Sequence, residues 1–97
     1  SEPSLTAIFA LNDLMAVGTL AALRELGRTD VSVMGFDDLP VAVDVTPKLT
    51  TIHLDLTAMG ANAMELVLDG QPPGRTVAAP ASLVVRDSTA RPSVGLA

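Results

Sequence analysis

The sequence contains no cysteine, very few aromatic side chains and little positive charge. Without cysteine there is no disulfide, no thiolate zinc site and no thiol nucleophile, which excludes the small disulfide-rich folds. Aromatic residues make up 2% of the 97 residues and both are Phe, so a core has to be built from aliphatic side chains and Met. Six basic residues against eleven acidic ones give a formal charge of −5. Such a segment has no positive field with which to grip DNA or RNA itself.

Membrane and export signals are also missing from the sequence. Residues 5–23 form a long apolar stretch, but Asn12 and Asp13 interrupt it near its middle, and a central Asp costs about 3 kcal/mol in a bilayer helix. The first four residues have no basic region of the kind that opens a signal peptide. The chain begins with Ser, and we expect it to be cut from a longer protein. With 48% hydrophobic residues it is expected to form one small folded domain.

The first third of the chain has the pattern of a strand, a helix and a second strand. Residues 6–11 are a short apolar run of strand formers, typical of a strand buried on both faces of a parallel sheet. A helix is predicted over 13–26, because good N-cap residues precede it and Gly27 falls where a C-terminal cap is expected. Residues 31–36 are the second predicted strand. This order is a βαβ unit with parallel strands.

The rest of the chain continues the alternation of helix and strand. The predicted elements are one helical turn over 41–45, a third strand over 50–54, a second helix over 56–68 and an extended segment over 76–86. Residues 90–97 are expected to form a mobile C-terminal tail. The predicted fold class is therefore α/β, with a parallel sheet.

The two predicted helices differ in how their apolar residues are distributed. In the first, one stripe holds Ala16, Leu20 and Leu23, and a second stripe holds Val17 and Ala21. A helix with two apolar faces is either buried between layers or covered by a second subunit. The helix over 56–68 has its apolar residues on one side, which predicts an ordinary helix packed on that side.

Polar pairs follow the first two predicted strands: Asn12 with Asp13, and Asp37 with Asp38. The carboxyl ends of adjacent parallel strands share one edge of the sheet, where ligands of open α/β sheets bind. Carboxylates and carboxamides at that edge suit a polyol, a sugar or a nucleoside. On spacing alone, the favoured interpretation is that all four residues are helix caps and turn formers.

An enzyme is a further alternative, since Asp13, Asp37 and Asp38 could supply oxygen ligands to magnesium. No glycine-rich phosphate loop and no nucleophile elbow accompanies them. His53, the single histidine, is expected to be a solvent-facing or hydrogen-bonded strand residue, not a catalytic base. The arginines of the turns and tail are expected to carry solvated charge: Arg75, Arg86 and Arg91.

Four segments in order carry a family resemblance. They are TAIFALNDLMAVG at 6–18, VSVMGFDD at 31–38, PKLTTI at 47–52 and SLVVRDST at 82–89. They resemble the strand-to-helix segment, the next strand with its acidic end, the proline–leucine–double-threonine segment and the closing strand of the lactose repressor (LacI/GalR) family of bacterial transcriptional regulators. The resemblance covers residues 5–89, which is nearly the whole chain.

The resemblance implies a type I periplasmic-binding-protein-like fold, in which each of two lobes is a parallel sheet flanked by helices and the effector binds in the cleft. Residues 1–89 correspond to the C-terminal portion of that effector-binding domain, so we expect a fragment with unpaired strand edges and an incomplete cleft. The helix over 56–68 would then pack on the other lobe. The helix-turn-helix that reads DNA in the family is absent from this segment.

The resemblance also implies roles for particular residues. Asn12 and Asp37 match positions that hydrogen-bond the effector's hydroxyl or ring groups, while Asp13 and Asp38 are either ligand contacts or structural residues. Leu54 stands where the family often has a Gln that reaches into the cleft, and Leu56 where an apolar or aromatic wall is usual. The first helix and the loop after the acidic pair would form the dimer interface, through Val17, Ala21, Val41 and Val45.

The function implied by the resemblance is sensing of a small, sugar-like effector by a cytoplasmic homodimeric regulator. Such a protein is no enzyme, needs no cofactor and no metal, touches no membrane, and contacts DNA only through a missing N-terminal domain. The alternative is a fragment of a periplasmic sugar-binding transport receptor, because the fold alone does not separate the two classes.

Overall fold

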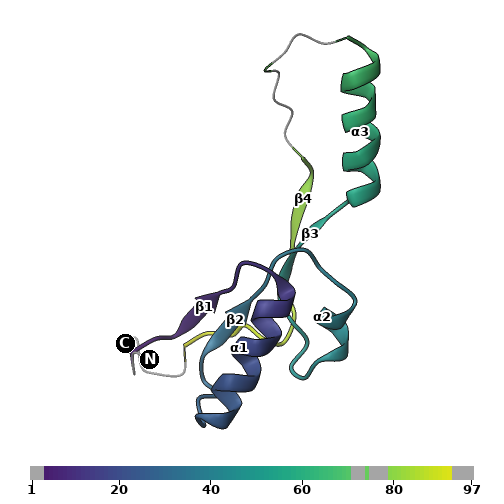
Figure 1. Cartoon of the computed structure of the whole chain (residues 1–97). Helices are drawn as coiled ribbons and strands as arrows, with labels where there is room; N and C mark the ends of the chain where they lie inside the picture. Colours follow the sequence, from purple (N-terminus) through teal and green to yellow (C-terminus); the bar gives the residue numbers. More distant parts are fainter. Residues whose placement is uncertain (1–3, 71–73, 75–78, 93–97) are drawn as a thin grey trace.

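The computed structural model describes residues 4–70, 74 and 79–92 and shows a small sheet from which an arm projects (Figure 1). The elements are β1 (Ala7–Phe9), α1 (Asp13–Glu25), β2 (Ser32–Met34), α2 (Val41–Asp44), β3 (Thr51–Leu54), α3 (Leu56–Leu68) and β4 (Ala81–Val84). The strands β3 and β4 lead away from α1 and carry α3 at their far end (Figure 1). The molecule therefore measures 54 × 30 × 20 Å along its principal axes.

The sheet is parallel over its first three strands. β1 pairs with β2 in parallel, with Ile8 opposite Val33. Two isolated parallel bridges join β2 to β3: Met34 with Thr50, and Asp37 with His53. β4 then pairs antiparallel with β3, with Thr51 opposite Val84. The predicted α/β class with a parallel sheet is confirmed, although each of these strands is shorter than its apolar run.

The core lies between α1 and the sheet, and it is built from aliphatic side chains alone. Its buried members are Ala10, Ala16, Leu23, Val31, Val33, Ala42 and Leu49, with Ile8, Leu20 and Val45 packed against them. The α1 stripe of Ala16, Leu20 and Leu23 therefore faces the core, as expected from its helical spacing. The second stripe does not: Val17 is half-buried and Ala21 is exposed.

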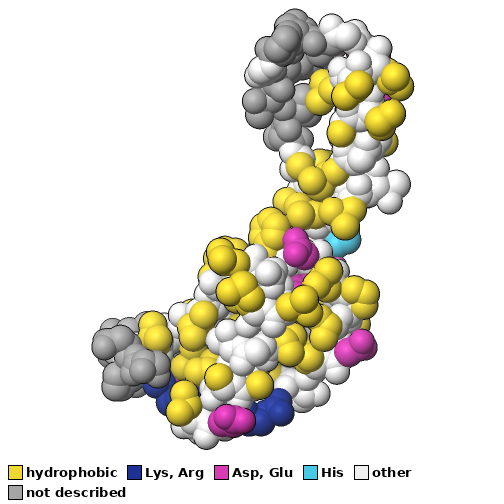
Figure 2. Space-filling view, in the orientation of Figure 1, with side chains coloured by type: hydrophobic (Ala, Val, Ile, Leu, Met, Phe, Trp, Pro, Cys, Tyr) yellow, Lys and Arg dark blue, Asp and Glu magenta, His cyan; other side chains and the backbone are white. Residues whose placement is uncertain are grey.

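Helix α3 has no buried residue at all. Asp55 caps it, since its Oδ1 accepts a hydrogen bond from Ala58 N (3.0 Å), but four of its large apolar side chains are more than half exposed: Leu56, Met64, Val67 and Leu68. Figure 2 shows hydrophobic side chains over α3 and along β3 and β4. The interpretation of α3 as a helix packed on one side is wrong for this chain taken by itself, because none of the residues of α3 is buried. No helix in the described segments has the length and apolarity to cross a membrane.

The segment after β4 is bonded into the sheet. Ser88 N donates to Lys48 O (2.9 Å) and Val33 N donates to Ser88 O (3.0 Å). The Ser88 hydroxyl donates to Val33 O (2.6 Å) and accepts from Thr50 N (2.8 Å), so this buried residue fills the space between β2 and β3. Ala90 exchanges two further hydrogen bonds with the hydroxyl of Ser32. Residues 93–97 of the expected tail lie outside the described residues.

Candidate functional site

Three of the predicted ligand residues lie along one edge of the sheet, which we call the carboxyl edge: Asn12 after β1, Asp37 after β2 and Leu54 at the end of β3. Two backbone hydrogen bonds hold these strand ends together: Asp13 N to Phe36 O (3.1 Å) and Asp37 N to Ile52 O (3.0 Å). The chain therefore places the polar groups of β1 and β2 beside one another, where open α/β sheets bind their ligands.

Asn12 is the N-cap of α1. Its Oδ1 accepts a hydrogen bond from Met15 N (2.8 Å), which satisfies one of the free N–H groups of the first turn. The cap uses the side-chain oxygen only, so the Nδ2 group is the donor that remains for a ligand. Asn12 is half-buried at the carboxyl edge. Capping and ligand binding are therefore compatible in this residue.

Asp13 is a structural residue. Its side chain is fully buried, and both carboxylate oxygens are occupied: Oδ1 accepts from Thr51 Oγ1 (2.7 Å) and Oδ2 from Leu39 N (2.7 Å). These bonds join α1 to β3 and to the loop after β2. The arrangement needs a glycine at position 35, because a Cβ there would collide with Asp13 Oδ1. Of the two roles open for Asp13, its burial and its two hydrogen bonds favour the structural one.

Asp37 has an environment different from that of Asp13 and from that of its neighbour Asp38. It is half-buried, and its backbone has φ 114°, in the left-handed region that non-glycine residues rarely adopt. Within the described segments no side-chain hydrogen bond satisfies its carboxylate. A strained backbone that presents an unsatisfied carboxylate at the carboxyl edge is the arrangement expected of a ligand contact.

Asp38 is an ion-paired residue. Its Oδ2 lies 2.9 Å from His53 Nδ1 and its Oδ1 lies 2.9 Å from Arg86 Nη2. The Asp38 side chain is 18% exposed and that of Arg86 is 17% exposed, so this pair is shielded from solvent. His53 was expected to be a solvent-facing or hydrogen-bonded strand residue, and it is hydrogen-bonded. Both oxygens of Asp38 are thus committed inside the chain.

The expectation of solvated charge at Arg86 is wrong. Its Nη1 donates to Leu49 O (2.9 Å), so the guanidinium links the loop before β3 to the carboxylate of Asp38. The one sign of this pairing in the sequence is that Arg86 follows the predicted last strand, which can pair with β3 and so lie near the two Asp residues after β2. Arg91 is exposed, and Arg75 lies outside the described residues.

The described residues contain no group of three His, Cys, Asp or Glu side chains that could hold a metal ion. Leu54 is half-buried at the end of β3. Leu56, the first residue of α3, is 67% exposed. The two leucines border the carboxyl edge on the side where the arm leaves the sheet, and their role as ligand contacts remains a prediction.

The second stripe of α1 lines an open groove of about 320 Å³ between this helix and the loop after α2. Its walls are Val17, Leu20, Ala21, Arg24, Val45 and Thr46. Arg24 crosses it, since Nη2 donates to Thr46 O (2.8 Å). Val41, at the start of α2, is half-buried. Three of the four predicted dimer residues thus line one apolar groove, with Val41 on the helix beside it.

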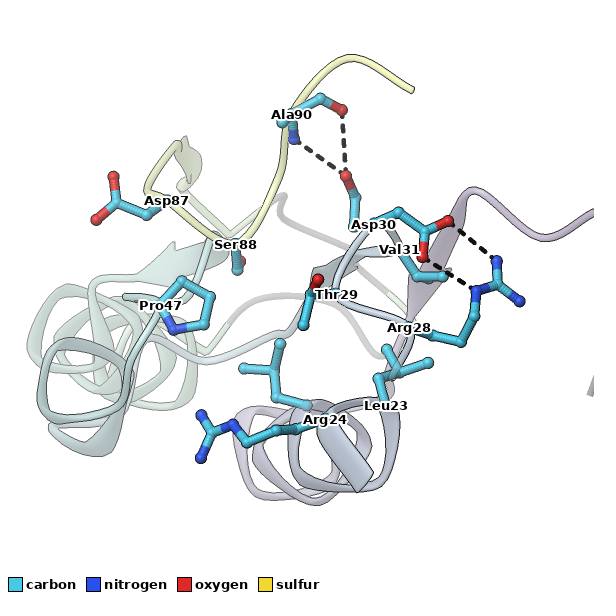
Figure 3. Close-up of a pocket in the computed structure, with 12 residues that line it drawn as sticks. Leu23, Arg24, Arg28, Thr29, Asp30, Val31, Pro47, Asp87, Ser88 and Ala90 are labelled. Atoms are coloured by element: carbon cyan, nitrogen blue, oxygen red, sulfur yellow. Dashed lines mark hydrogen bonds and ion pairs between the residues drawn. The ribbon is translucent and has the colours of Figure 1, made fainter. Parts of the chain in front are cut away.

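A smaller pocket of about 120 Å³ lies at the opposite end of the sheet (Figure 3). Leu23 of α1, Val31, Pro47 and Ser88 are among its walls. At its rim Arg28 Nε donates to Asp30 Oδ1 (3.0 Å), and this hydrogen bond holds the pKa of the Asp30 carboxyl below its usual range. The same bond raises the pKa of Arg28. The two side chains are 26% and 34% exposed, so the pair is a weak surface contact.

Comparison with known proteins identifies the family. Residues 1–89 match the model of the periplasmic binding protein-like domain. The HTH-type transcriptional regulator GalS of Salmonella typhimurium is 46% identical over 69 residues, which are 68% of this chain and 20% of GalS. The lactose operon repressor of Rhizobium radiobacter is 37% identical over 93 residues, covering 90% of this chain and 82% of that sequence.

A solved structure agrees with this assignment. The crystal structure of a LacI family transcriptional regulator from Arthrobacter sp. FB24, in complex with lactose, superposes with a TM-score of 0.77 at 36% identity and covers 91% of this chain. The chain spans 37% of that structure and a fifth of GalS. It belongs to the periplasmic-binding-protein-like domain family, in the group whose members are LacI-family transcriptional regulators.

Proposed function

We propose that this chain is the C-terminal part of the effector-binding domain of a LacI-type transcriptional regulator, and that it senses a sugar-like molecule at the carboxyl edge. The observation that carries the proposal is the pairing of two available polar groups on neighbouring strand ends. Asn12 has its Nδ2 donor and Asp37 its carboxylate, while Asp13 and Asp38 are committed inside the chain.

The chemistry of these two groups suits vicinal hydroxyls. A hydroxyl both donates and accepts, so one can donate to the Asp37 carboxylate while its neighbour accepts from Asn12. Leu54 and Leu56 offer apolar surface to the C–H face of a sugar ring. Leu54 has no polar group to offer, which favours an effector with a less polar face on that side. The lactose bound to the Arthrobacter regulator supports a saccharide as the ligand class.

The carboxyl edge is half of a binding cleft. Beside Asn12, Leu11 is 80% exposed and Leu14 is 66% exposed, and such apolar surface next to polar ligand groups is typical of a site that is covered on binding. In our proposal the second lobe of the complete protein supplies the opposing wall and receives α3. Effector binding between the lobes shifts the population toward a closed form.

The regulator proposal includes a dimer. The groove lined by Val17, Ala21 and Val45, with Val41 beside it, would face a second subunit, and closure of the lobes would change the spacing of two N-terminal DNA-binding domains. This work takes place in the cytoplasm and involves neither catalysis nor a cofactor. The alternative is a periplasmic sugar receptor of the same fold. The coding sequence ahead of residue 1 separates them: a helix-turn-helix supports the regulator, and a cleavable leader supports the receptor.

The ligand site is tested with Asp37→Asn in the complete protein. Titration calorimetry with a panel of mono- and disaccharides that includes lactose should show binding to the wild type. Loss of a hydrogen bond to a charged group corresponds to roughly 10- to 100-fold weaker binding in the variant. The matched control is Asp87→Asn, which removes an exposed carboxylate away from the carboxyl edge and should bind normally. Equal affinity for wild type and Asp37→Asn would remove Asp37 from the site, and a wild type that binds no saccharide would refute the proposed effector class.

A further inference from the structure

The turn that presents Asp37 has a conformation that must be held from outside. Asp37 has φ 114° and Asp38 has φ 58°, so two consecutive non-glycine residues lie in the left-handed region. Such residues persist there only where the surrounding structure fixes them. Contacts with the neighbouring elements must therefore fix this turn.

Three successive backbone N–H groups of the turn are hydrogen-bonded to other parts of the fold. Asp37 N donates to Ile52 O (3.0 Å) and Asp38 N donates to Thr51 Oγ1 (3.3 Å). One residue later, Leu39 N donates to the buried Asp13 (2.7 Å). These contacts anchor the turn to α1 and to β3.

The side chain of Asp38 supplies two further contacts. It lies between His53 of β3 and Arg86, two residues beyond β4, and each is 2.9 Å from one of its oxygens. Arg86 is itself fixed, because its Nη1 donates to Leu49 O (2.9 Å) and its backbone N donates to Thr50 Oγ1 (2.8 Å). Asp38 therefore contacts β3 and the segment that follows β4, at the base of the arm.

The shielding of this pair separates it from ordinary surface charge. The side chains of Asp38 and Arg86 are 18% and 17% exposed, whereas those of Arg28 and Asp30, a second Arg–Asp pair among the described residues, are 26% and 34% exposed. The lower exposure of Asp38 and Arg86 reduces screening by water and salt, although Arg28 too donates a further hydrogen bond, from Nη2 to Leu5 O (3.1 Å). The Asp38–Arg86 pair is thus the stronger candidate for holding a strained backbone in place.

We propose that Asp38, held between Arg86 and His53, is a positioning residue that fixes the turn presenting Asp37 and ties that turn to the base of the β3–β4 arm. The inference rests on the proposed function in so far as Asp37 is the effector contact. A displacement of the arm relative to the sheet moves Arg86 and His53, and through Asp38 it moves the turn. By linkage, a ligand that fixes Asp37 also restricts the arm.

The experiment is hydrogen exchange of the complete protein, followed by mass spectrometry and carried out without any sugar. Asp38→Asn keeps the size of the side chain and a residue type that tolerates the left-handed region, but removes the charge. Exchange should become about tenfold faster or more in peptides covering 36–39 and 50–54, as expected for loss of a charged hydrogen bond, and stay unchanged in α1. Asp30→Asn, which breaks the exposed Arg–Asp pair, is the matched control and should leave those peptides as they are.

A second pair of variants separates charge from packing. Arg86→Met leaves a flexible apolar side chain without the charge, whereas Arg86→Lys keeps a long side chain with a positive charge. Exchange at 36–39 should be fast in Arg86→Met and largely restored toward wild type in Arg86→Lys. A uniform increase across the chain in Asp38→Asn, or equal exchange in the Lys and Met variants, would overturn the proposal. Because no sugar is present, this outcome is independent of whether Asp37→Asn loses saccharide binding.

Discussion

Asp13 provides the sharpest stability prediction, because its two hydrogen bonds connect three parts of the fold. Asp13→Ala leaves Leu39 N without its partner and deprives the Thr51 hydroxyl of its acceptor. Hydrogen bonds to charged groups contribute about 1.5–3 kcal/mol each, and a carboxylate in the first turn of a helix adds about 0.3–1 kcal/mol. The expected loss in the free energy of unfolding is therefore roughly 3–7 kcal/mol. That is a large part of the 5–15 kcal/mol typical of a whole domain.

The isosteric Asp13→Asn variant should cost much less. Its amide oxygen can accept from Leu39 N, and its NH2 group can donate to Thr51 Oγ1, so only the charge and some geometry are lost. We expect about 1–2 kcal/mol. Thr51→Val removes the hydroxyl that donates to Asp13 and keeps the shape of the side chain, so it should lower the free energy of unfolding by about 1–3 kcal/mol. This variant tests the same hydrogen bond if Asp13→Ala does not fold.

The assay is urea unfolding of the complete protein followed by circular dichroism. Asp44→Asn, at an exposed carboxylate on α2, is the control and should change the free energy by no more than about 0.5 kcal/mol. If Asp13→Ala loses less than about 1 kcal/mol, or if Asp13→Asn is as unstable as Asp13→Ala, the view of Asp13 as a hydrogen-bonded junction is refuted.

Two further predictions test packing and assembly. Gly35→Ala should lower the free energy of unfolding by about 1–3 kcal/mol, because the new Cβ collides with Asp13 Oδ1, whereas Gly18→Ala, whose Cβ meets no atom within 4 Å, should not destabilise in the same urea assay. Val17→Asp puts a carboxylate into the proposed dimer groove and should give monomers in sedimentation velocity, with Ala22→Asp on the same helix as the control; a dimer mass for Val17→Asp would contradict the predicted interface.

Local patterns in the sequence predicted the elements of the fold well. The helix bounds of α1 and α3 follow from caps that act within three residues, such as Asn12 on Met15 and Asp55 on Ala58. Strand lengths were overestimated because apolar runs continue past the last ladder hydrogen bond. The packing of α3 could not be predicted from its own pattern, because an apolar face shows that a partner is needed and not where that partner is encoded.

The candidate site was predictable only in outline. Spacing placed Asn12 and Asp37 on one edge, but it could not divide the acidic residues by role. That division depends on contacts far apart in the sequence, since Asp13 meets Thr51, 38 residues on, and Asp38 meets Arg86 in the segment after β4. Contacts between residues this far apart produce no periodic pattern in the sequence, and Arg86 was therefore expected to carry solvated charge.

The bonding of Ser88 between β2 and β3 has a consequence for how the protein is made. Val33 and Thr50 emerge from the ribosome well before Ser88, yet Val33 N and O and Thr50 N all find their partners on that residue. Until then these backbone groups of the nascent chain are bonded to water, and the middle of the sheet stays open. These contacts therefore form only after Ser88 has left the ribosome, and a ribosome that stalls before the codon for Ser88 holds a chain whose β2 and β3 are not yet joined there.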